Sequence, residues 1–219
     1  MDLDTYIVTL ATLYSLISVF AGVVVHELGH LFAARFLTIQ VLSVSIGFGP
    51  EIVGFTDRHG VRWKLAPLIV GGSCSFQEQP RGREHTNAVN LRSLCEASPK
   101  DRVIVLLAGP AFNLCFAGLI WLIFYFHNCI FPSLSEVELM LGLPAFLVTG
   151  SCAIALFNLL PIPPLDGGYL SLVLLEVLRG RALSYEKQLV RVSAWVITVV
   201  TVIASVLLLP QIATSLSQP

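Results

Sequence analysis

One apolar stretch of the chain, residues 7–36, reads IVTLATLYSLISVFAGVVVHELGHLFAARF. It exceeds the roughly 20 apolar residues that a helix needs to cross a bilayer. His26, Glu27 and His30 interrupt it near one end. Ionisable side chains inside a spanning helix are costly and are usually functional. The stretch therefore predicts a membrane helix that carries a chemical site near one face of the bilayer.

The overall composition supports a membrane location. Of the 219 residues, 55% are apolar and 12% are charged, whereas soluble domains carry about 25% charged residues. Three further stretches are long enough to cross a bilayer: 103–126, 139–160 and 192–209. A shorter one, 167–178, continues the third after a break. We therefore predict an α-helical integral membrane protein with four transmembrane crossings and a single domain over residues 1–219.

The Lys and Arg residues indicate how these crossings are oriented. All 13 of them end the first crossing, lie between the first and second, or lie between the third and fourth. Because cytoplasmic loops carry an excess of Lys and Arg, we expect both basic connections in the cytoplasm and both termini outside. The acidic start at residues 1–4 and the length of the first stretch argue against a cleaved signal peptide.

Charge and cysteine content exclude other classes of protein. A formal net charge of −1 offers no basic surface for a nucleic-acid partner. The five cysteines are scattered and no C-x-x-C pair occurs. The sequence therefore predicts neither a disulfide scaffold nor a thiolate metal site.

Residues 41–72, after the first crossing, have the pattern of β-structure. Short apolar segments alternate with turn residues, and Gly47 and Gly49 stand at the first turn. We predict a membrane-associated β-loop or hairpin on the cytoplasmic side. Two placements stay open: a loop dipping toward a water-filled cavity, or a hairpin resting on the membrane surface. Residues 75–87 predict a polar loop, and residues 91–95 a short interfacial helix.

The segment HELGH at residues 26–30 has the spacing of a metal site. Residues four apart share one face of a helix, so His26 and His30 can hold the same ion. Glu27 points about 100° away and can reach a water at the metal from the side. The H-E-x-x-H pattern is typical of zinc sites in which the Glu is the general base.

The candidate for a third ligand is Asp166, within NLLPIPPLDGG at residues 158–168. A catalytic zinc needs three protein ligands and one open position. The prolines cannot continue a helix, so the chain becomes extended there. His30 and Asp166 both lie toward the cytoplasmic face. The alternative for Asp166 is a surface turn residue, because Pro, Asp and Gly are ordinary turn residues.

Other polar residues in the apolar stretches have less specific interpretations. Gly109 and Asn113 are four apart, which favours packing against a neighbouring helix over catalysis. Asn158 can bond a substrate backbone or cap the helix that ends there. The remaining histidines are expected to be solvated: His59, His85 and His127.

Other intramembrane chemistries do not fit. An aspartyl site needs two carboxylates that share a proton, and no second Asp lies within a crossing. A serine site needs a nucleophile with its base, and Ser151 has no intramembrane His of its own to pair with.

These motifs resemble the site-2 protease family of intramembrane zinc metalloproteases. HELGH at 26–30 matches its first motif, and Asn158, Pro161 and LDG at 165–167 match its second. SIGFG at 45–49 and AGPAFN at 108–113 are similar to segments of the bacterial regulator-of-sigma-E protease branch.

The resemblance implies a set of roles. Zn²⁺ would be held by His26, His30 and Asp166, with Glu27 as the catalytic base. Asn158 and the β-loop that contains Gly47 and Gly49 would help to hold an unwound substrate. The location implied is a bacterial inner membrane, with both termini periplasmic. Substrates would be membrane-spanning proteins, with an anti-sigma factor or signal-peptide remnants as examples.

One feature departs from that branch, whose members commonly carry PDZ domains between the second and third crossings. Residues 126–138 leave no room for one, and no CBS domain is expected. We therefore expect a minimal core that takes pre-trimmed substrates or relies on a separate substrate-selecting partner.

The expected reaction is hydrolysis of a peptide bond within or near a substrate's membrane helix. Zinc acidifies water, Glu27 takes the proton, and an edge of the β-region pairs with the extended substrate. Two alternatives stay open: a zinc transporter and a catalytically silent metal-binding protein. A transporter does not require Glu27 and usually shows internal repeats, which this sequence lacks.

Overall fold

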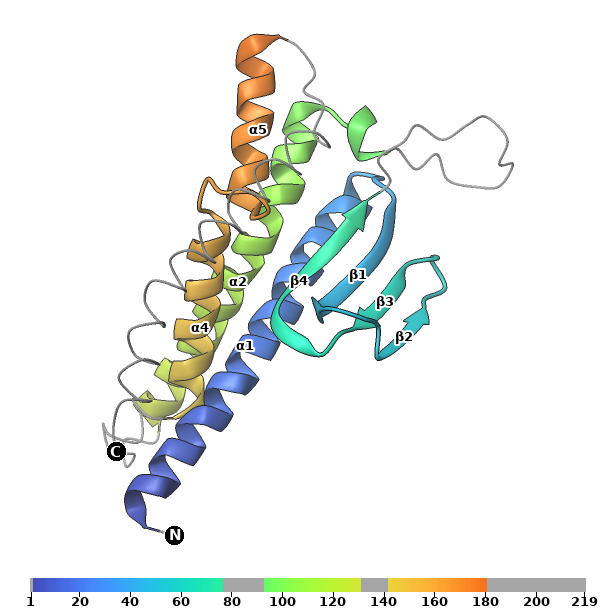
Figure 1. Ribbon diagram of the computed structural model, residues 1–219. Coiled ribbons are helices and arrows are strands. Elements are labelled where there is room, and N and C mark those ends of the chain that lie inside the picture. Colours follow the sequence, from blue (N-terminus) through green and yellow to red (C-terminus); the bar gives the residue numbers. More distant parts are fainter. Residues whose placement is uncertain (1, 77–92, 131–141, 181–219) are drawn as a thin grey trace, which may run out of the picture. The chain divides into compact units, whose positions relative to one another are not determined.

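The computed structural model describes residues 2–76, 93–130 and 142–180. The chain divides into two compact units, residues 1–159 and 160–219. In the described residues, the first unit contains three long helices and a sheet, and the second contains one helix (Figure 1).

The two longest helices are apolar along most of their length. They are α1 (Leu3–Phe36) and α2 (Pro99–Ile130). The Asp2 carboxylate caps α1 by accepting a 3.1 Å hydrogen bond from the Thr5 backbone N–H. Both helices are long and apolar enough to cross a membrane, with a mean hydropathy of 2.2 each. The predicted first and second crossings therefore coincide with helices of the required length.

Helix α4 (Leu143–Asn158) covers most of the predicted third crossing. It is apolar, but its 16 described residues are fewer than a perpendicular crossing needs. The predicted fourth crossing, 192–209, lies outside the described residues. Two candidate spans are thus present in the part of the chain that the structure describes, and four crossings stay a prediction.

A four-stranded sheet lies between α1 and α2 in the sequence, with strand order β2–β3–β1–β4. Its strands are β1 (Val41–Phe48), β2 (Val53–Thr56), β3 (Arg62–Leu65) and β4 (Leu68–Phe76). β1 runs parallel to β3 and antiparallel to β4, and β2 runs antiparallel to β3. The predicted β-structure is confirmed, but a simple hairpin is wrong, because β1 pairs with two later strands.

The predicted boundaries after this sheet also change. β4 continues to Phe76, past the predicted end at residue 72, because Ser73 and Ser75 still pair with β1. Residues 75 and 76 are therefore strand, and the rest of the predicted polar loop lies outside the described residues. In place of the predicted interfacial helix, the described part forms a short 3₁₀ turn, η1 (Leu94–Glu96).

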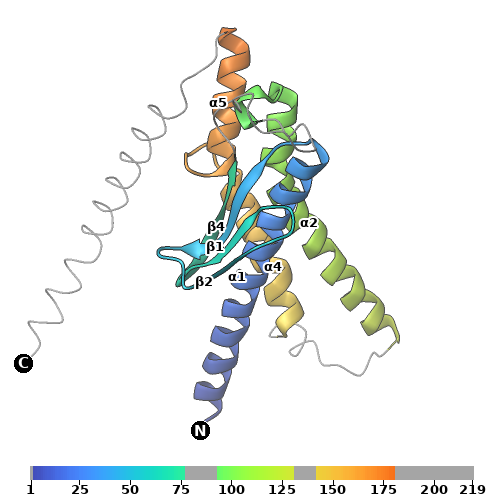
Figure 2. The same ribbon diagram turned by 90° about the vertical axis from the view of Figure 1, so that its right-hand side faces the viewer.

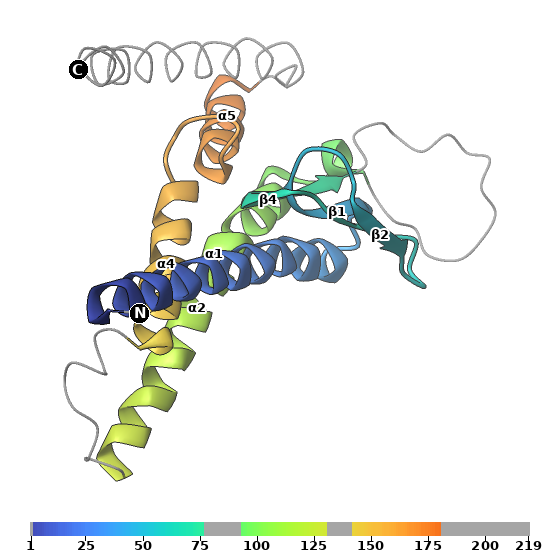
Figure 3. The same ribbon diagram turned by 60° about the horizontal axis from the view of Figure 1, so that its bottom comes forward.

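The sheet packs against the C-terminal half of α1, and α4 crosses nearer the N-terminal half (Figure 3). An apolar core joins α1, the sheet and α2, and its buried members are Leu31, Ala34, Ile39, Val41, Val44, Val61, Ala97 and Val105. Burial of these apolar side chains is the main force that holds the sheet against α1 and α2. The core begins one residue after the HELGH segment, so it fixes the sheet and α2 beside that segment.

Asp57, in the turn between β2 and β3, ties the sheet to the end of α1. Its carboxylate accepts hydrogen bonds from the Arg35 guanidinium (2.7 Å), the Trp63 indole (3.3 Å) and two backbone N–H groups. Burial alone would raise the pKa of Asp57, but the bonds from Val61, Trp63, His59 and Arg35 outweigh it and hold the pKa at about 2.

Small residues line the contact between α1 and α4. A β-carbon on Gly22 would lie 2.5 Å from Ile154 Cδ1, and one on Gly150 would meet the Ser18 hydroxyl. Figure 2 shows α4 between the diverging halves of α1 and α2. Small side chains at such contacts let helix backbones approach closely.

In the second unit, the predicted helix break is confirmed. The chain turns through residues 160–165, with Ile162 N–H donating to Leu160 O and Leu165 N–H donating to Ile162 O. Helix α5 (Asp166–Arg179) follows and ends at Gly180, which has the positive φ of 61° typical of a helix C-terminus.

Candidate metal centre

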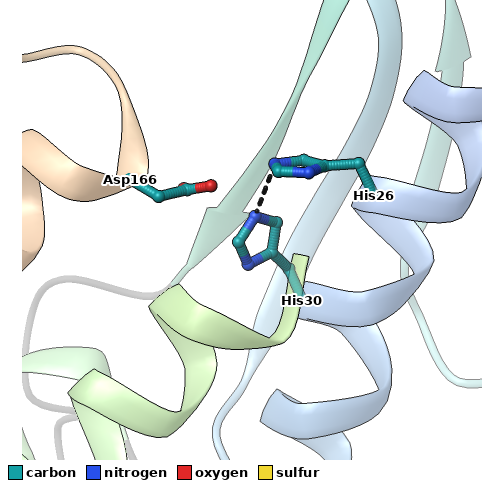
Figure 4. A group of neighbouring side chains, drawn as sticks. All are labelled: His26, His30 and Asp166. Carbon is teal, nitrogen blue, oxygen red and sulfur yellow. Dashed lines mark hydrogen bonds between the residues drawn. The ribbon is translucent and has the colours of Figure 1, made fainter. Parts of the chain in front are cut away.

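His26 and His30 lie on successive turns of α1, and their imidazoles meet (Figure 4). Both are 5% exposed. The two Nε2 atoms are 3.1 Å apart, and the rings meet edge to face at 82°. With zinc–nitrogen bonds of about 2.0–2.1 Å and a tetrahedral angle, two imidazoles on one ion would hold their nitrogens about 3.3 Å apart. The pair is therefore arranged to bind one ion through its Nε2 atoms.

The backbone of α2 orients His30. His30 Nδ1 lies 2.8 Å from the carbonyl oxygen of Val105. Because a carbonyl only accepts, Nδ1 carries the proton and donates. The lone pair of a neutral His30 is then on Nε2, which is the tautomer that a metal requires.

The side chain of Asn113 lies beside the other histidine. Asn113 Nδ2 is 3.5 Å from His26 Nδ1, and Asn113 has no exposed surface. The sequence indicated only packing for Asn113. The structure adds a polar contact with one of the two imidazoles.

Glycines allow the helices to close around this pair. A β-carbon on Gly29 would lie 2.5 Å from the carbonyl oxygen of Ala108, and one on Gly109 would lie 2.5 Å from His30 Nε2. No side chain fits at either position without displacing α2 or the imidazole. The α2 backbone therefore forms one wall of the site.

Glu27 faces the sheet instead of α2. It is 4% exposed, and a β-carbon on Gly72 of β4 would lie 2.6 Å from Glu27 Oε1. The carboxylate thus lies against the backbone of an edge strand, beside the histidine pair on the same helix. This is the position expected of a base that acts on a water next to the metal.

Asp166 lies in the second unit, as the first residue of α5. The positive end of a helix dipole favours a carboxylate at that place. Two imidazoles and one carboxylate form a donor set that zinc accepts. The residue types present therefore fit a zinc ion.

Comparison with known proteins identifies the family. Residues 14–136 and 132–203 match peptidase family M50, the family of the site-2 proteases. The chain belongs to peptidase family M50. The resemblance noted in the motifs is thereby confirmed over most of the chain.

Curated relatives of this M50 chain are named as candidate zinc metalloproteases. A Brucella suis protein is 39% identical over 112 residues, covering 47% of this chain and 30% of the relative. A Mesorhizobium japonicum protein is 38% identical over 121 residues (48% and 31%), and an Agrobacterium fabrum protein 34% identical over 132 residues (56% and 34%). The chain thus spans about a third of the length of these relatives.

Membership of M50 and the two long apolar helices make this a membrane-associated protein. The histidine pair lies within one of those helices, α1. The candidate metal ligands His26 and His30 thus lie on a helix that is long and apolar enough to cross a membrane.

The residues predicted to bind substrate in this M50 chain have individual structural roles. Gly47 and Gly49 adopt positive φ angles of 92° and 112°, and a β-carbon on Gly47 would lie 2.6 Å from the carbonyl oxygen of Ala66. Asn158 Nδ2 donates to Ile154 O (3.0 Å), the carbonyl one turn earlier in α4. The turn conformations and the Asn158 hydrogen bond give each of these residues a role in the local structure. Substrate contact stays a prediction for Gly47, Gly49 and Asn158.

The remaining predicted histidines lie away from the pair. His59 is exposed in the β2–β3 turn, and His127 is exposed and stacks on Phe124. His85 lies outside the described residues. Val105 and Gly72 were missed by the sequence analysis, because a backbone carbonyl and a strand glycine have no signature when the fold is unknown.

Proposed function

We propose that this chain is the core of an intramembrane zinc metalloprotease that hydrolyses peptide bonds within or near the membrane-spanning helices of other proteins. The observation that carries the proposal is the buried histidine pair of α1, with Glu27 beside it, in a chain of peptidase family M50. The names of the relatives support zinc as the metal.

We propose Asp166 as the third ligand. Its support is its residue type and its segment: it is a carboxylate within LDG at residues 165–167, which resembles the second motif of the site-2 proteases. A carboxylate completes the two-imidazole, one-carboxylate arrangement of many catalytic zinc sites and leaves a fourth position open.

Different residues of this chain have different roles in the proposed hydrolysis. Bound zinc supplies a Lewis acid for the peptide carbonyl and acidifies water. Glu27 takes the proton from the attacking water and returns it to the leaving amine. The Val105 carbonyl holds the His30 ring, and the close packing of α2 excludes water from that side. Removal of Glu27 alone should therefore stop hydrolysis without removing the metal.

The substrate would bind as an extended strand on β4. A helical substrate hides its peptide bonds, so it must unwind first, and pairing with an edge strand replaces the backbone hydrogen bonds it loses. β4 is an edge of the sheet, and Gly72 on β4 abuts Glu27. These features favour β4 over β2, the opposite edge, as the docking strand.

The expected setting is a bacterial inner membrane, with both termini periplasmic and the sheet on the cytoplasmic side. Membrane-spanning proteins are the substrate class, for example an anti-sigma factor or signal-peptide remnants. A separate partner would select substrates for a core without a PDZ domain.

The deciding test is Glu27→Gln. Purified wild type and variant are incubated with a single-helix reporter in detergent or liposomes, and cut product and bound zinc are measured in the same samples. We expect cleavage by the wild type only and equal zinc in both, because Gln keeps the size of the side chain but cannot take a proton. The expected loss of rate is at least 100-fold.

Glu96→Gln is the matched control, since Gln also satisfies the capping box at η1. Equal cleavage by Glu27→Gln and wild type would refute Glu27 as the base. If both proteins bind zinc and neither cuts the reporter, a transporter or a silent metal-binding protein becomes the better account.

A further inference from the structure

Asn113 is a buried polar side chain that hydrolysis as proposed above does not use. It lies on α2 with no exposed surface, and its Oδ1 atom has no hydrogen-bond partner. Leaving a buried acceptor unpaired costs about 1–3 kcal/mol. Its Nδ2 atom is 3.5 Å from His26 Nδ1, the outer limit of a hydrogen bond.

The hydrogen bond of His30 defines which of its ring nitrogens carries the proton. His30 donates from Nδ1 to the Val105 carbonyl, so His30 Nε2 is an acceptor. His26 Nε2 lies 3.1 Å from His30 Nε2, close to the separation that a shared metal ion would set. At the other nitrogen of the His26 ring, the Asn113 amide faces Nδ1.

A metal ion between the two Nε2 atoms would require the tautomer of His26 that carries its proton on Nδ1, because each ligand nitrogen offers a lone pair to the metal. Nδ1–H then needs a buried acceptor. Half a turn of the Asn113 amide brings Oδ1, the atom without a partner, to the place that Nδ2 occupies.

We propose that Asn113 is a positioning residue for His26 that accepts a hydrogen bond from its Nδ1–H when metal is bound. An amide can take this role because its oxygen accepts hydrogen bonds and the planar group can turn that oxygen toward the ring. Partners of this kind orient ligating histidines and typically change metal affinity 10–100-fold when removed. The proposal rests on metal binding by His26 in the proposed function, and it does not depend on cleavage.

Two substitutions separate this role from packing. Asn113→Leu keeps the size but removes both polar atoms, and Asn113→Asp keeps an acceptor for Nδ1–H. Packing alone predicts that Leu is tolerated and that a buried carboxylate is harmful. A positioning role predicts the reverse order for metal affinity. Ser151→Ala is the control, because Ser151 is also fully buried with an unpaired hydroxyl but lies on α4.

Zinc affinity is measured on the full chain by competition with a chromogenic chelator, and Co²⁺ absorption reports the geometry of the site. We expect Asn113→Leu to bind zinc 10–100-fold more weakly with an altered Co²⁺ spectrum, and Asn113→Asp to stay within about threefold of wild type. Wild-type affinity in Asn113→Leu, or equal losses in Leu and Asp, would overturn the proposal. A chain that binds zinc as expected but cleaves nothing would refute only the proposed function.

Discussion

His26 and His30 present their Nε2 atoms to one another because both Nδ1 atoms are occupied by groups on α2. The backbone carbonyl of Val105 allows only one tautomer of His30, whereas the amide of Asn113 can serve either tautomer of His26. Both groups can therefore hold their histidine with the Nε2 lone pair toward an ion.

Single glycines decide how close the neighbouring backbone comes to these rings. Gly29 on α1 faces α2, and Gly109 on α2 faces α1; a β-carbon added to either glycine would lie 2.5 Å from an atom of the facing helix. On the sheet side, Gly72 allows the backbone of β4 to approach the Glu27 carboxylate in the same way. The site is thus enclosed by main chain, which cannot rotate away as a side chain can.

Asp57 is a residue whose ionisation should be visible in stability. Its pKa falls from an ordinary 3.8 to about 2 in the folded chain, so its carboxylate stabilises the fold above pH of about 4 and loses this effect as the pH falls toward 2. At 1.36 kcal/mol per pKa unit the contribution is about 2 kcal/mol. We expect Asp57→Asn to lower the unfolding temperature at pH 6 and the difference from wild type to shrink to about half by pH 3.

Thermal unfolding in detergent at pH 6, 4 and 3 measures this effect. Asp4→Asn, which neutralises an exposed carboxylate at the other end of α1, is the control. A gap between wild type and Asp57→Asn that stays constant with pH would contradict the assignment.

Helix α1 carries three of the proposed chemical groups, and they face two different neighbours. His30 and His26 face α2, and Glu27 faces β4. This follows from helix geometry, because neighbouring residues are about 100° apart. The metal and the base can therefore be set by separate elements, and β4 can dock a substrate without disturbing the ligands.

Prolines on the two edge strands test which edge takes the substrate. We expect Ser73→Pro or Ser75→Pro on β4 to reduce cleavage of a helical reporter about tenfold or more, since each lost backbone hydrogen bond costs about 0.5–1.5 kcal/mol and proline adds steric conflict. Val53→Pro on β2 is the matched control at another exposed edge position and should leave the rate within about twofold.

Cleavage rates are compared at equal zinc content, so that loss of the metal is not mistaken for loss of docking. If the β4 and β2 variants are equally active, the substrate does not pair with this sheet.

The proposed ligands come from both compact units of the chain: the histidines from residues 1–159 and Asp166 from residues 160–219. A ligand that binds only the folded form stabilises it by about 4 kcal/mol at 1,000 times its dissociation constant. Zinc should therefore act on the stability of the protein as well as on its chemistry.

Asp166→Asn tests whether Asp166 is a ligand. We expect zinc to bind at least tenfold more weakly and to raise the unfolding temperature less than in wild type, because a neutral amide replaces an anionic ligand. Chelator competition and thermal unfolding with and without zinc measure both effects, with Asp4→Asn as the control. Unchanged zinc affinity would make Asp166 a turn residue and leave the third ligand to be found elsewhere.

Several features of this protein follow from local sequence alone. The i, i+4 spacing of His26 and His30 places them on one helix face whatever else the chain does. The helices of residues 3–36 and 99–130 follow from long apolar runs, and the break before α5 follows from its prolines. Each of these depends on residues within a few turns of one another.

Long-range packing decided the rest. The mixed sheet, the Val105 carbonyl on His30 and the Asn113 amide on His26 join residues far apart in the chain, with separations of 75 and 87 residues for the last two. Such contacts depend on how whole helices and strands bury their apolar surfaces together. No local pattern encodes that arrangement, so a motif could name the metal ligands but not the groups that hold them.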